Sequence, residues 1–240
     1  MPGRLWPGIF FIPHMKEVID FLNELSLNND KVWFEANRAR YNEARAKVEA
    51  LTAELIAGIR KFDDSIWPLQ VRDCTYRIYR DLRFSPDKTP YKTHMGIYIT
   101  RGGKKSGYSG YYFQIGSAAA SNLIAVGDIC CEPKVLKVIR EDIQNGEGDF
   151  RRIIASADPR FMVDTDGAAK RVPMGFPADS PDAELLKLRH FCLYFTVNDR
   201  FVTSRDLASR LVDIFHSGKP FLDYINRAVD YVREEEGFTK

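Results

Sequence analysis

Hydrophobic residues in the first third of the chain repeat at the spacing of amphipathic helices. Val18, Phe21 and Leu25 recur at three- and four-residue intervals, which predicts a helix near residues 16–26. A longer stripe recurs every seven residues, and its members are Phe34, Tyr41, Val48, Leu55 and Phe62. Charged residues fill the positions between them, so the stripe predicts one helix of about thirty residues over 29–62 that buries one face.

The middle of the chain changes to the two-residue period of strands. Alternation predicts strands over 75–84, 95–100 and 111–115, and an apolar run predicts another over 123–126. The strand over 75–84 would have its polar side chains on one face. The links between them are too short for a parallel return, so neighbouring strands are expected to be antiparallel. An apolar run at 191–197 predicts one further strand.

Helical spacing returns in the last third. It predicts helices at 133–143, 150–155 and 182–189, then two C-terminal helices, one ending near Gly218 and the other beginning at Phe221. Helices on both sides of a run of antiparallel strands predict an α+β fold. The sheet, with strands within 75–126 and at 191–197, is expected to pack against the long N-terminal helix and the C-terminal helices.

Length and composition indicate one globular domain. The 240 residues are 45% hydrophobic and 28% charged, which is ordinary for a folded protein. We expect an N-terminal extension (1–15), a single domain (16–232) and a frayed tail (233–240). No apolar run reaches the ~18–20 residues needed to cross a bilayer, and the N-terminus lacks the pattern of a signal peptide.

The four cysteines, none in a Cys-x-x-Cys pair, are expected to be unpaired in a cytoplasmic protein. Histidines and cysteines lack metal-ligand spacing, so the sequence predicts no metal site. Nucleotide-binding and serine-hydrolase motifs are also missing, and no cofactor is predicted. Whether the protein is an enzyme stays open, as does its oligomeric state.

Positive charge is concentrated in residues 72–105, which hold nine lysines and arginines against three aspartates, although the whole chain carries only +2. Such a local excess favours an anionic ligand. A strand over 75–84 would align arginine and tyrosine side chains on one face, which suits phosphate or carboxylate binding. The predicted ligand-binding residues are Arg77, Tyr79, Arg83, Lys88, Lys92 and Tyr98. His94, beside this segment, is the candidate for a general base.

Two alternatives compete with this hypothesis. The arginines could instead pair with Asp81, Asp87 and acids of the long helix, and Arg80, on the apolar face, would need a carboxylate partner. A single-stranded nucleic acid could stack on the interleaved tyrosines. Against that, the total charge is low and the sequence contains no recognised nucleic-acid-binding motif. A protein-partner module without catalysis belongs to the same alternative.

Three stretches of the sequence carry a resemblance to a known family. They are 29–41 (NDKVWFEANRARY), 77–94 (RIYRDLRFSPDKTPYKTH), and 171–177 (RVPMGFP) followed by 184–187 (ELLK). Together they resemble the domain-of-unknown-function family 2461, which is found in bacteria and fungi. The resemblance covers residues 15–230 and leaves out the first dozen. It implies a single α+β domain and no particular activity.

Overall fold

The computed structural model describes residues 15–83, 85–146 and 148–237. All but the last residue of the expected N-terminal extension lies outside these ranges, as do Phe84 and the last three residues of the expected tail. None of the described helices is both long and apolar enough to cross a membrane.

The described residues form one five-stranded sheet in the order β1-β2-β3-β5-β4, with every neighbouring pair antiparallel. The strands are β1 (His94–Ile99), β2 (Gly110–Gly116), β3 (Asn122–Asp128), β4 (Met162–Val163) and β5 (Phe191–Val197). The predictions for β1, β2, β3 and β5 are confirmed, together with the antiparallel pairing and the α+β class. The edge strand β4 was not predicted, because two residues are too few to show a period.

The strand expected over 75–84 is not formed in the described residues 75–83. A short helix, α4 (Val71–Cys74), precedes an extended segment that makes isolated antiparallel bridges, Thr75 with Ile97 and Tyr79 with Tyr91. The segment thus leaves β1 after its first bridge and pairs with the chain returning from its own loop. The two prolines of that loop lack N–H donors, which limits the ladder there.

The N-terminal helices are α1 (Lys16–Leu27), α2 (Lys31–Ala36) and α3 (Arg38–Ile59). The prediction of one continuous helix over 29–62 is therefore wrong, because α2 and α3 are two separate helices in this range. The side-chain amide of Asn37 donates to the Trp33 carbonyl at 2.9 Å and ends α2. The seven-residue stripe is nevertheless buried on both sides of the break, at Phe34, Tyr41 and Val48.

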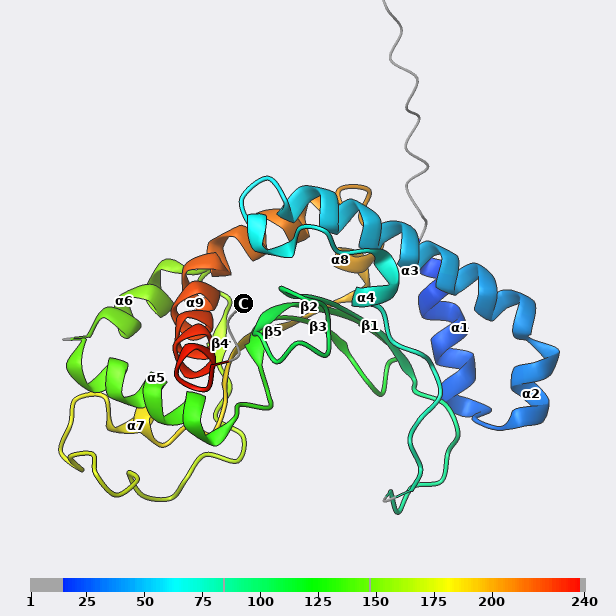
Figure 1. Cartoon of the computed structure of the whole chain (residues 1–240). Helices are drawn as coiled ribbons and strands as arrows, with labels where there is room; N and C mark the ends of the chain where they lie inside the picture. The colour runs from blue at the N-terminus through cyan, green and yellow to red at the C-terminus, as the bar shows by residue number, and fades with distance from the viewer. Residues whose placement is uncertain (1–14, 84, 147, 238–240) are drawn as a thin grey trace, which may run out of the picture.

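The C-terminal helices predicted as two form one, α9 (Leu207–Glu235), with Gly218 and Pro220 inside it. A Cβ built on Gly218 would lie 2.8 Å from Cγ1 of Val126. This glycine marks a close approach of helix and sheet and does not end the helix. The axis of α9 bends along its length (Figure 1), as expected where proline removes a helical hydrogen bond.

The remaining described helices are all shorter than α3. They are a 3-10 turn (Asp64–Ile66), α5 (Pro133–Asn145), α6 (Asp149–Ser156), α7 (Ala183–Leu186) and α8 (Asp199–Val202). The predictions near 133–143 and 150–155 are confirmed, while the helix expected over 182–189 is only one turn long.

The two faces of the sheet have different surroundings. Odd-numbered β1 and β2 residues, such as Ile97 and Phe113, are buried beneath α1, α3 and α9, which cover that face. Figure 1 shows the helices above the arched sheet, with α1 and α2 at one end and α5, α6 and α7 at the other. The opposite face carries Gly96, Tyr112 and Ala125 and opens into a cleft.

Candidate functional site

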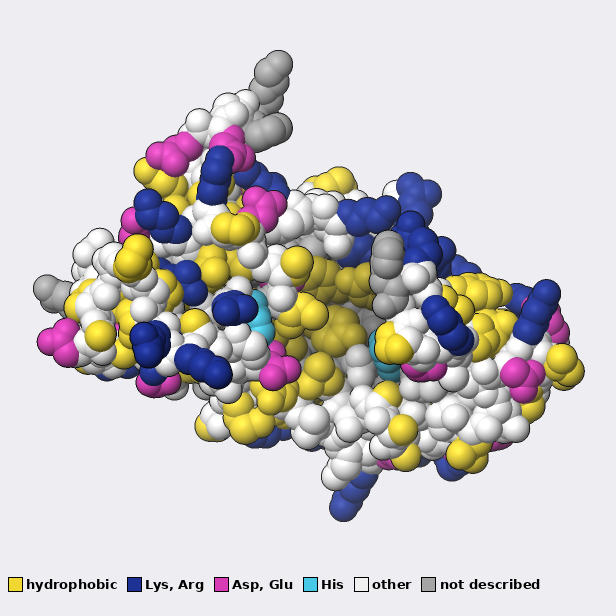
Figure 2. Space-filling view, turned by 90° about the horizontal axis from the view of Figure 1, so that it is seen from below, with side chains coloured by type: hydrophobic (Ala, Val, Ile, Leu, Met, Phe, Trp, Pro, Cys, Tyr) yellow, Lys and Arg dark blue, Asp and Glu magenta, His cyan; other side chains and the backbone are white. Residues whose placement is uncertain are grey.

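The cleft on the uncovered sheet face has a volume of about 1050 Å³. Figure 2 looks into this side of the molecule and shows a hollow lined by hydrophobic side chains, with lysines and arginines gathered along one border. The floor comes from alternate positions of four strands: Tyr98, Tyr112, Gln114, Leu123, Ala125 and Tyr194. An apolar and aromatic floor of this kind suits the body of a small organic ligand.

Hydrogen bonds hold the floor in one arrangement. The Tyr98 hydroxyl lies 3.1 Å from the carbonyl oxygens of Tyr108 and Gly127, to either of which it can donate its one proton. The Tyr112 hydroxyl donates to Gln114 Oε1 at 2.8 Å. Burial raises the pKa of both tyrosines, so the floor is neutral and preorganised.

One side of the cleft is a basic wall, made of Arg38, Arg45, Arg72, Arg77 and Lys92. Arg38 pairs with Glu35 of α2, and Arg45 pairs with Glu49 of α3. In contrast, neither Arg77 nor Lys92 forms an ion pair with any described residue. Burial, and then the charge of Arg77, lower the pKa of Lys92. The Lys92 Nζ lies 5.3 Å from the centroid of the Tyr76 ring.

Another part of the lining is an acidic wall formed by Asp128, Asp164 and Asp166. Asp128, the last residue of β3, accepts the backbone N–H of Cys130 at 3.0 Å, and burial raises its pKa. Asp164 follows β4, and its Oδ2 lies 3.1 Å from His190 Nε2. The geometry of this contact does not meet the requirements of a hydrogen bond. His190 Nε2 therefore has no hydrogen-bond partner within the described residues.

The acidic wall was not predicted from the sequence. Its aspartates lie at the ends of strands far apart in the sequence, and β5 brings them together by pairing with both β3 and β4. The available signal was Asp128 at the end of a predicted strand, but nothing local linked it to residues 164–166.

The predicted ligand-binding residues divide into two groups. Arg77, Tyr79, Lys92 and Tyr98 line the cleft, and so does His94, the candidate base. Arg83 and Lys88 lie instead on the loop that follows Tyr79. Arg83 pairs with Asp81 at 2.6 Å, and Lys88 donates to the Leu82 carbonyl at 3.1 Å. Because the chain over 75–83 does not continue as a strand, these two cations leave the cleft.

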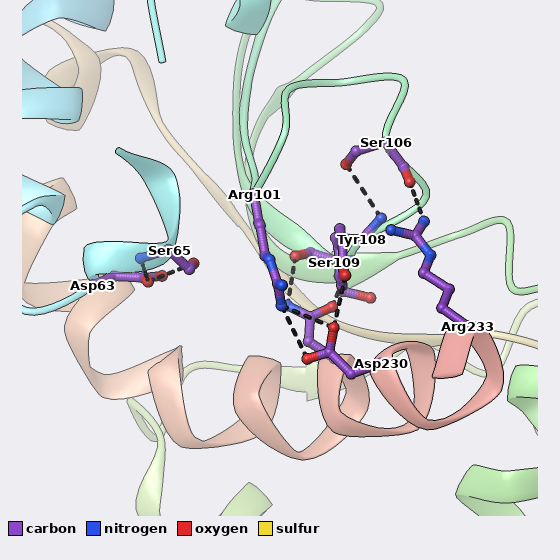
Figure 3. A network of polar contacts seen from close by, with 9 residues as sticks. Asp63, Ser65, Arg101, Ser106, Tyr108, Ser109, Asp230 and Arg233 are labelled. Carbon is purple, nitrogen blue, oxygen red and sulfur yellow. Dashed lines mark hydrogen bonds and ion pairs between the residues drawn. The ribbon is translucent and has the colours of Figure 1, made fainter. Parts of the chain in front are cut away.

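Two other cations of the predicted basic segment are used within the fold. Arg80 contacts Asp87 and Thr89, as expected for an arginine that needs a carboxylate partner, and its side chain is 25% exposed. Arg101 and the Tyr108 hydroxyl both contact Asp230 of α9, at 2.8 and 2.6 Å (Figure 3). The glycine-rich β1–β2 connection is thereby attached to α9.

His94 is a neutral imidazole at pH 7, because burial and the charge of Lys92 lower its pKa. It keeps its place as a candidate base, although no described carboxylate orients it. The described residues contain no group of three or more histidines, cysteines or acids placed to hold a metal ion. All four cysteines, each within the described ranges, are free thiols, and Cys192 lies on the cleft floor.

Comparison with known proteins gives one result for the family and none for individual proteins. No curated protein and no solved structure matches the chain. A family model described as "Conserved hypothetical protein (DUF2461)" matches residues 17–224. This match spans all five strands of the sheet, the cleft and the segments that carried the resemblance, so the chain belongs to the DUF2461 family of conserved hypothetical proteins.

Proposed function

We propose that the protein binds a small molecule with an anionic group, a phosphate or a carboxylate, in the cleft beneath the sheet. The observation that carries the proposal is the arrangement of Arg77 and Lys92. Both cations line the cleft, and neither has an ion-pair partner among the described residues. Their mutual repulsion is unfavourable until an anion lies between them.

Arg77 and Lys92 would supply complementary contacts. The guanidinium can bind two oxygens of a phosphate or carboxylate at once, whereas the ammonium acts as a point charge. The nearby Tyr79 hydroxyl accepts from Arg38 at 3.4 Å, so its own proton is free to be donated. Tyr98 has a different role, because its proton is engaged by backbone carbonyls. It shapes the floor and supplies no donor to the anion.

The cleft volume of about 1050 Å³ exceeds what an inorganic ion needs. The apolar floor therefore favours an anion attached to an organic body that removes the floor from water. Four free thiols support a cytoplasmic location as part of the same proposal, since reducing compartments keep thiols unpaired.

A second candidate is binding of a single-stranded nucleic acid, favoured by one observation. The Tyr76 side chain is 43% exposed, and the Lys92 and Lys104 amines lie 5.3 and 5.9 Å from its ring centroid. A base could stack there while the lysines contact phosphates. Binding of generic oligonucleotides with a steep dependence on salt concentration would support this candidate over the small-molecule one.

The test of the main proposal is thermal unfolding in phosphate and in chloride of equal ionic strength. Phosphate binding to the folded state should raise the melting temperature of the parent protein. Arg77→Ala and Lys92→Ala should each weaken phosphate binding by about tenfold, the usual effect of losing a charged hydrogen bond.

Arg83→Ala is the matched control, because Arg83 belongs to the same segment but lies outside the cleft. It also corrects for the general stabilisation that phosphate gives to any folded protein. The proposal is wrong if the phosphate-dependent shift is the same in the parent, Arg77→Ala, Lys92→Ala and Arg83→Ala proteins.

A further inference from the structure

The geometry points to a ligand with two opposite charges, whose anionic group contacts Arg77 and Lys92 and whose ammonium group contacts Asp128. This inference rests on the proposed function and narrows it to zwitterionic molecules, such as aminoalkyl phosphates or amino acids. Asp128 is then the residue that selects ligands with an ammonium group. Three properties of Asp128 suit it to this role: its position in the cleft, the absence of a described ion-pair partner, and its influence on Tyr76.

The position of Asp128 is set by the backbone of β3. Gly127 has φ +128°, and a Cβ there would lie 2.2 Å from the Phe191 carbonyl oxygen. Only glycine tolerates this conformation and this close approach. The strand therefore delivers Asp128 to the cleft in a defined backbone conformation, one residue after the carbonyl that can accept the Tyr98 hydroxyl proton.

No lysine or arginine of the described residues forms an ion pair with Asp128. Its Oδ1 accepts the Cys130 N–H, and the Ile129 N–H also acts on the carboxylate and lowers its pKa. Two backbone donors leave part of the acceptor capacity of the two oxygens unused. His190 is near enough to lower the pKa of Asp128, but the two side chains do not come within ion-pair distance of each other. A half-buried carboxylate with unused acceptor capacity can bind an ammonium group, which has three N–H donors.

Tyr76 connects the two charged walls. The Lys92 amine lies 5.3 Å from the centroid of its ring, and the Asp128 carboxylate contributes to raising the pKa of its hydroxyl. A ligand bound beside Tyr76 would therefore be near the Lys92 ammonium, which lies over the ring, and within the influence of the Asp128 carboxylate, which acts on the hydroxyl. Its carbon chain would cover the apolar floor, and its two charges would match the two walls.

The other acids on this side are less suited to the role. Asp164 is beside His190 and accepts the Asp166 N–H at 2.9 Å, while the Asp166 side chain belongs to an exposed loop residue. Neither influences Tyr76 as Asp128 does. Asp128 is thus the aspartate of this wall whose charge acts on the same tyrosine as Lys92 contacts.

The inference is tested with two series of probes of equal chain length. Aminoalkyl phosphates with two to six carbons carry both charges, and alkyl phosphates of the same lengths carry only the anion. At the best length, the aminoalkyl phosphate should bind the parent protein about tenfold more tightly than its alkyl counterpart, as expected for a charged hydrogen bond. Amino carboxylates of the same lengths, measured alongside, show whether phosphate or carboxylate is the preferred anion.

Asp128→Asn is the decisive variant, because the amide oxygen can still accept the Cys130 N–H but the negative charge is gone. It should abolish the preference for the ammonium group without weakening the binding of alkyl phosphates, because the loss of a nearby negative charge does not disfavour an anion. Asp20→Asn, on the surface of α1 and paired with Lys16, is the control for net charge and should behave like the parent.

The two proposals fail in different ways. Equal binding of both series to the parent, or an equal loss of both in Asp128→Asn, overturns the zwitterion inference and leaves the anion site standing. If neither series binds and phosphate causes no thermal shift, the proposed function is overturned, and the zwitterion inference with it.

Discussion

At the scale of single residues, the cleft contains charged groups whose burial the fold does not compensate. The pKa of Lys92 is lowered and that of Asp128 is raised, in both cases chiefly by burial. Each shift disfavours the charged form. Elsewhere in the same segment, Arg80 and Arg83 have carboxylate partners. Partly buried charges without an ion-pair partner are typical of binding sites.

Lys92→Met is therefore expected to raise the free energy of unfolding at pH 7, by up to about 1 kcal/mol after allowance for solvent screening. Methionine has a similar shape and places no charge in the cleft wall. Urea unfolding of the two proteins measures the difference. The exposed Lys16, paired with Asp20, provides the control Lys16→Met, which should not be stabilised.

The pH dependence of this difference follows from the sign of the shift. Between the lowered pKa of folded Lys92 and its ordinary value of 10.5, the unfolded chain binds more protons than the folded one. The parent protein consequently gains stability from Lys92 as pH rises through that window. The advantage of Lys92→Met should shrink over the same window, and a variant less stable than the parent at every pH would contradict the account.

At the scale of elements, α9 shows how packing overrides local sequence signals. Gly218 and Pro220 would ordinarily end a helix, yet α9 continues because residues on both sides of them are buried, including Phe215, Phe221 and Leu222. The glycine has a specific purpose, since β3 passes close to the helix at Val126. Local sequence indicates a break, and the shared core decides against it.

Gly218→Ala is expected to lower the free energy of unfolding by about 1–3 kcal/mol through overpacking against Val126, offset in part by the higher helix propensity of alanine. The cost should be smaller when Val126 is also replaced by alanine, because the clash is with its methyl groups. Chemical unfolding of the parent, both single variants and the double variant gives the coupling. Additive effects would show that the close approach is not the cause.

At the scale of the whole molecule, the sheet separates stability from the proposed binding. Its covered face holds buried polar anchors such as Tyr111, whose hydroxyl donates to Asp63 Oδ2 at 2.8 Å. Ser65 donates to the other oxygen of Asp63 through both its backbone and its hydroxyl (Figure 3). The cleft face holds the basic and acidic walls. Tyr111 and Tyr112 are neighbours in β2, but Tyr111 lies in the core and Tyr112 lines the cleft.

Tyr111→Phe should lower the free energy of unfolding by about 1–3 kcal/mol, because the buried Asp63 carboxylate loses a donor. Phosphate binding should be unchanged, since Tyr111 lies on the covered face. Tyr112→Phe, one residue further on the cleft face, loses only a bond between neutral groups and should cost about 0.5–1.5 kcal/mol. Calorimetry and phosphate titration of both variants measure the two effects. A loss of phosphate binding in Tyr111→Phe would disprove the separation of stability from binding between the two faces.

Local patterns in the sequence determined most of the elements and part of the site. Side-chain periods located β1, β2, β3 and β5, because alternation depends only on which face of a strand is buried. The seven-residue stripe correctly placed Phe34 of α2 and Tyr41, Val48 and Leu55 of α3 in the core, but could not show the break at Asn37. The charge excess of residues 72–105 led to Arg77, Lys92 and their neighbours on the cleft.

Only the tertiary structure decided which charges meet. Arg83 and Lys88 leave the cleft because the chain at Tyr79 and Arg80 pairs with residues 90 and 91 and not with β1. The alternation of polar and apolar residues does not show which partner a segment pairs with. Asp128 and Asp164 come together because β5 pairs with both β3 and β4 across a long stretch of chain. Periodicity reports which side of an element is buried, whereas pairing between distant strands depends on the total free energy of the packed sheet.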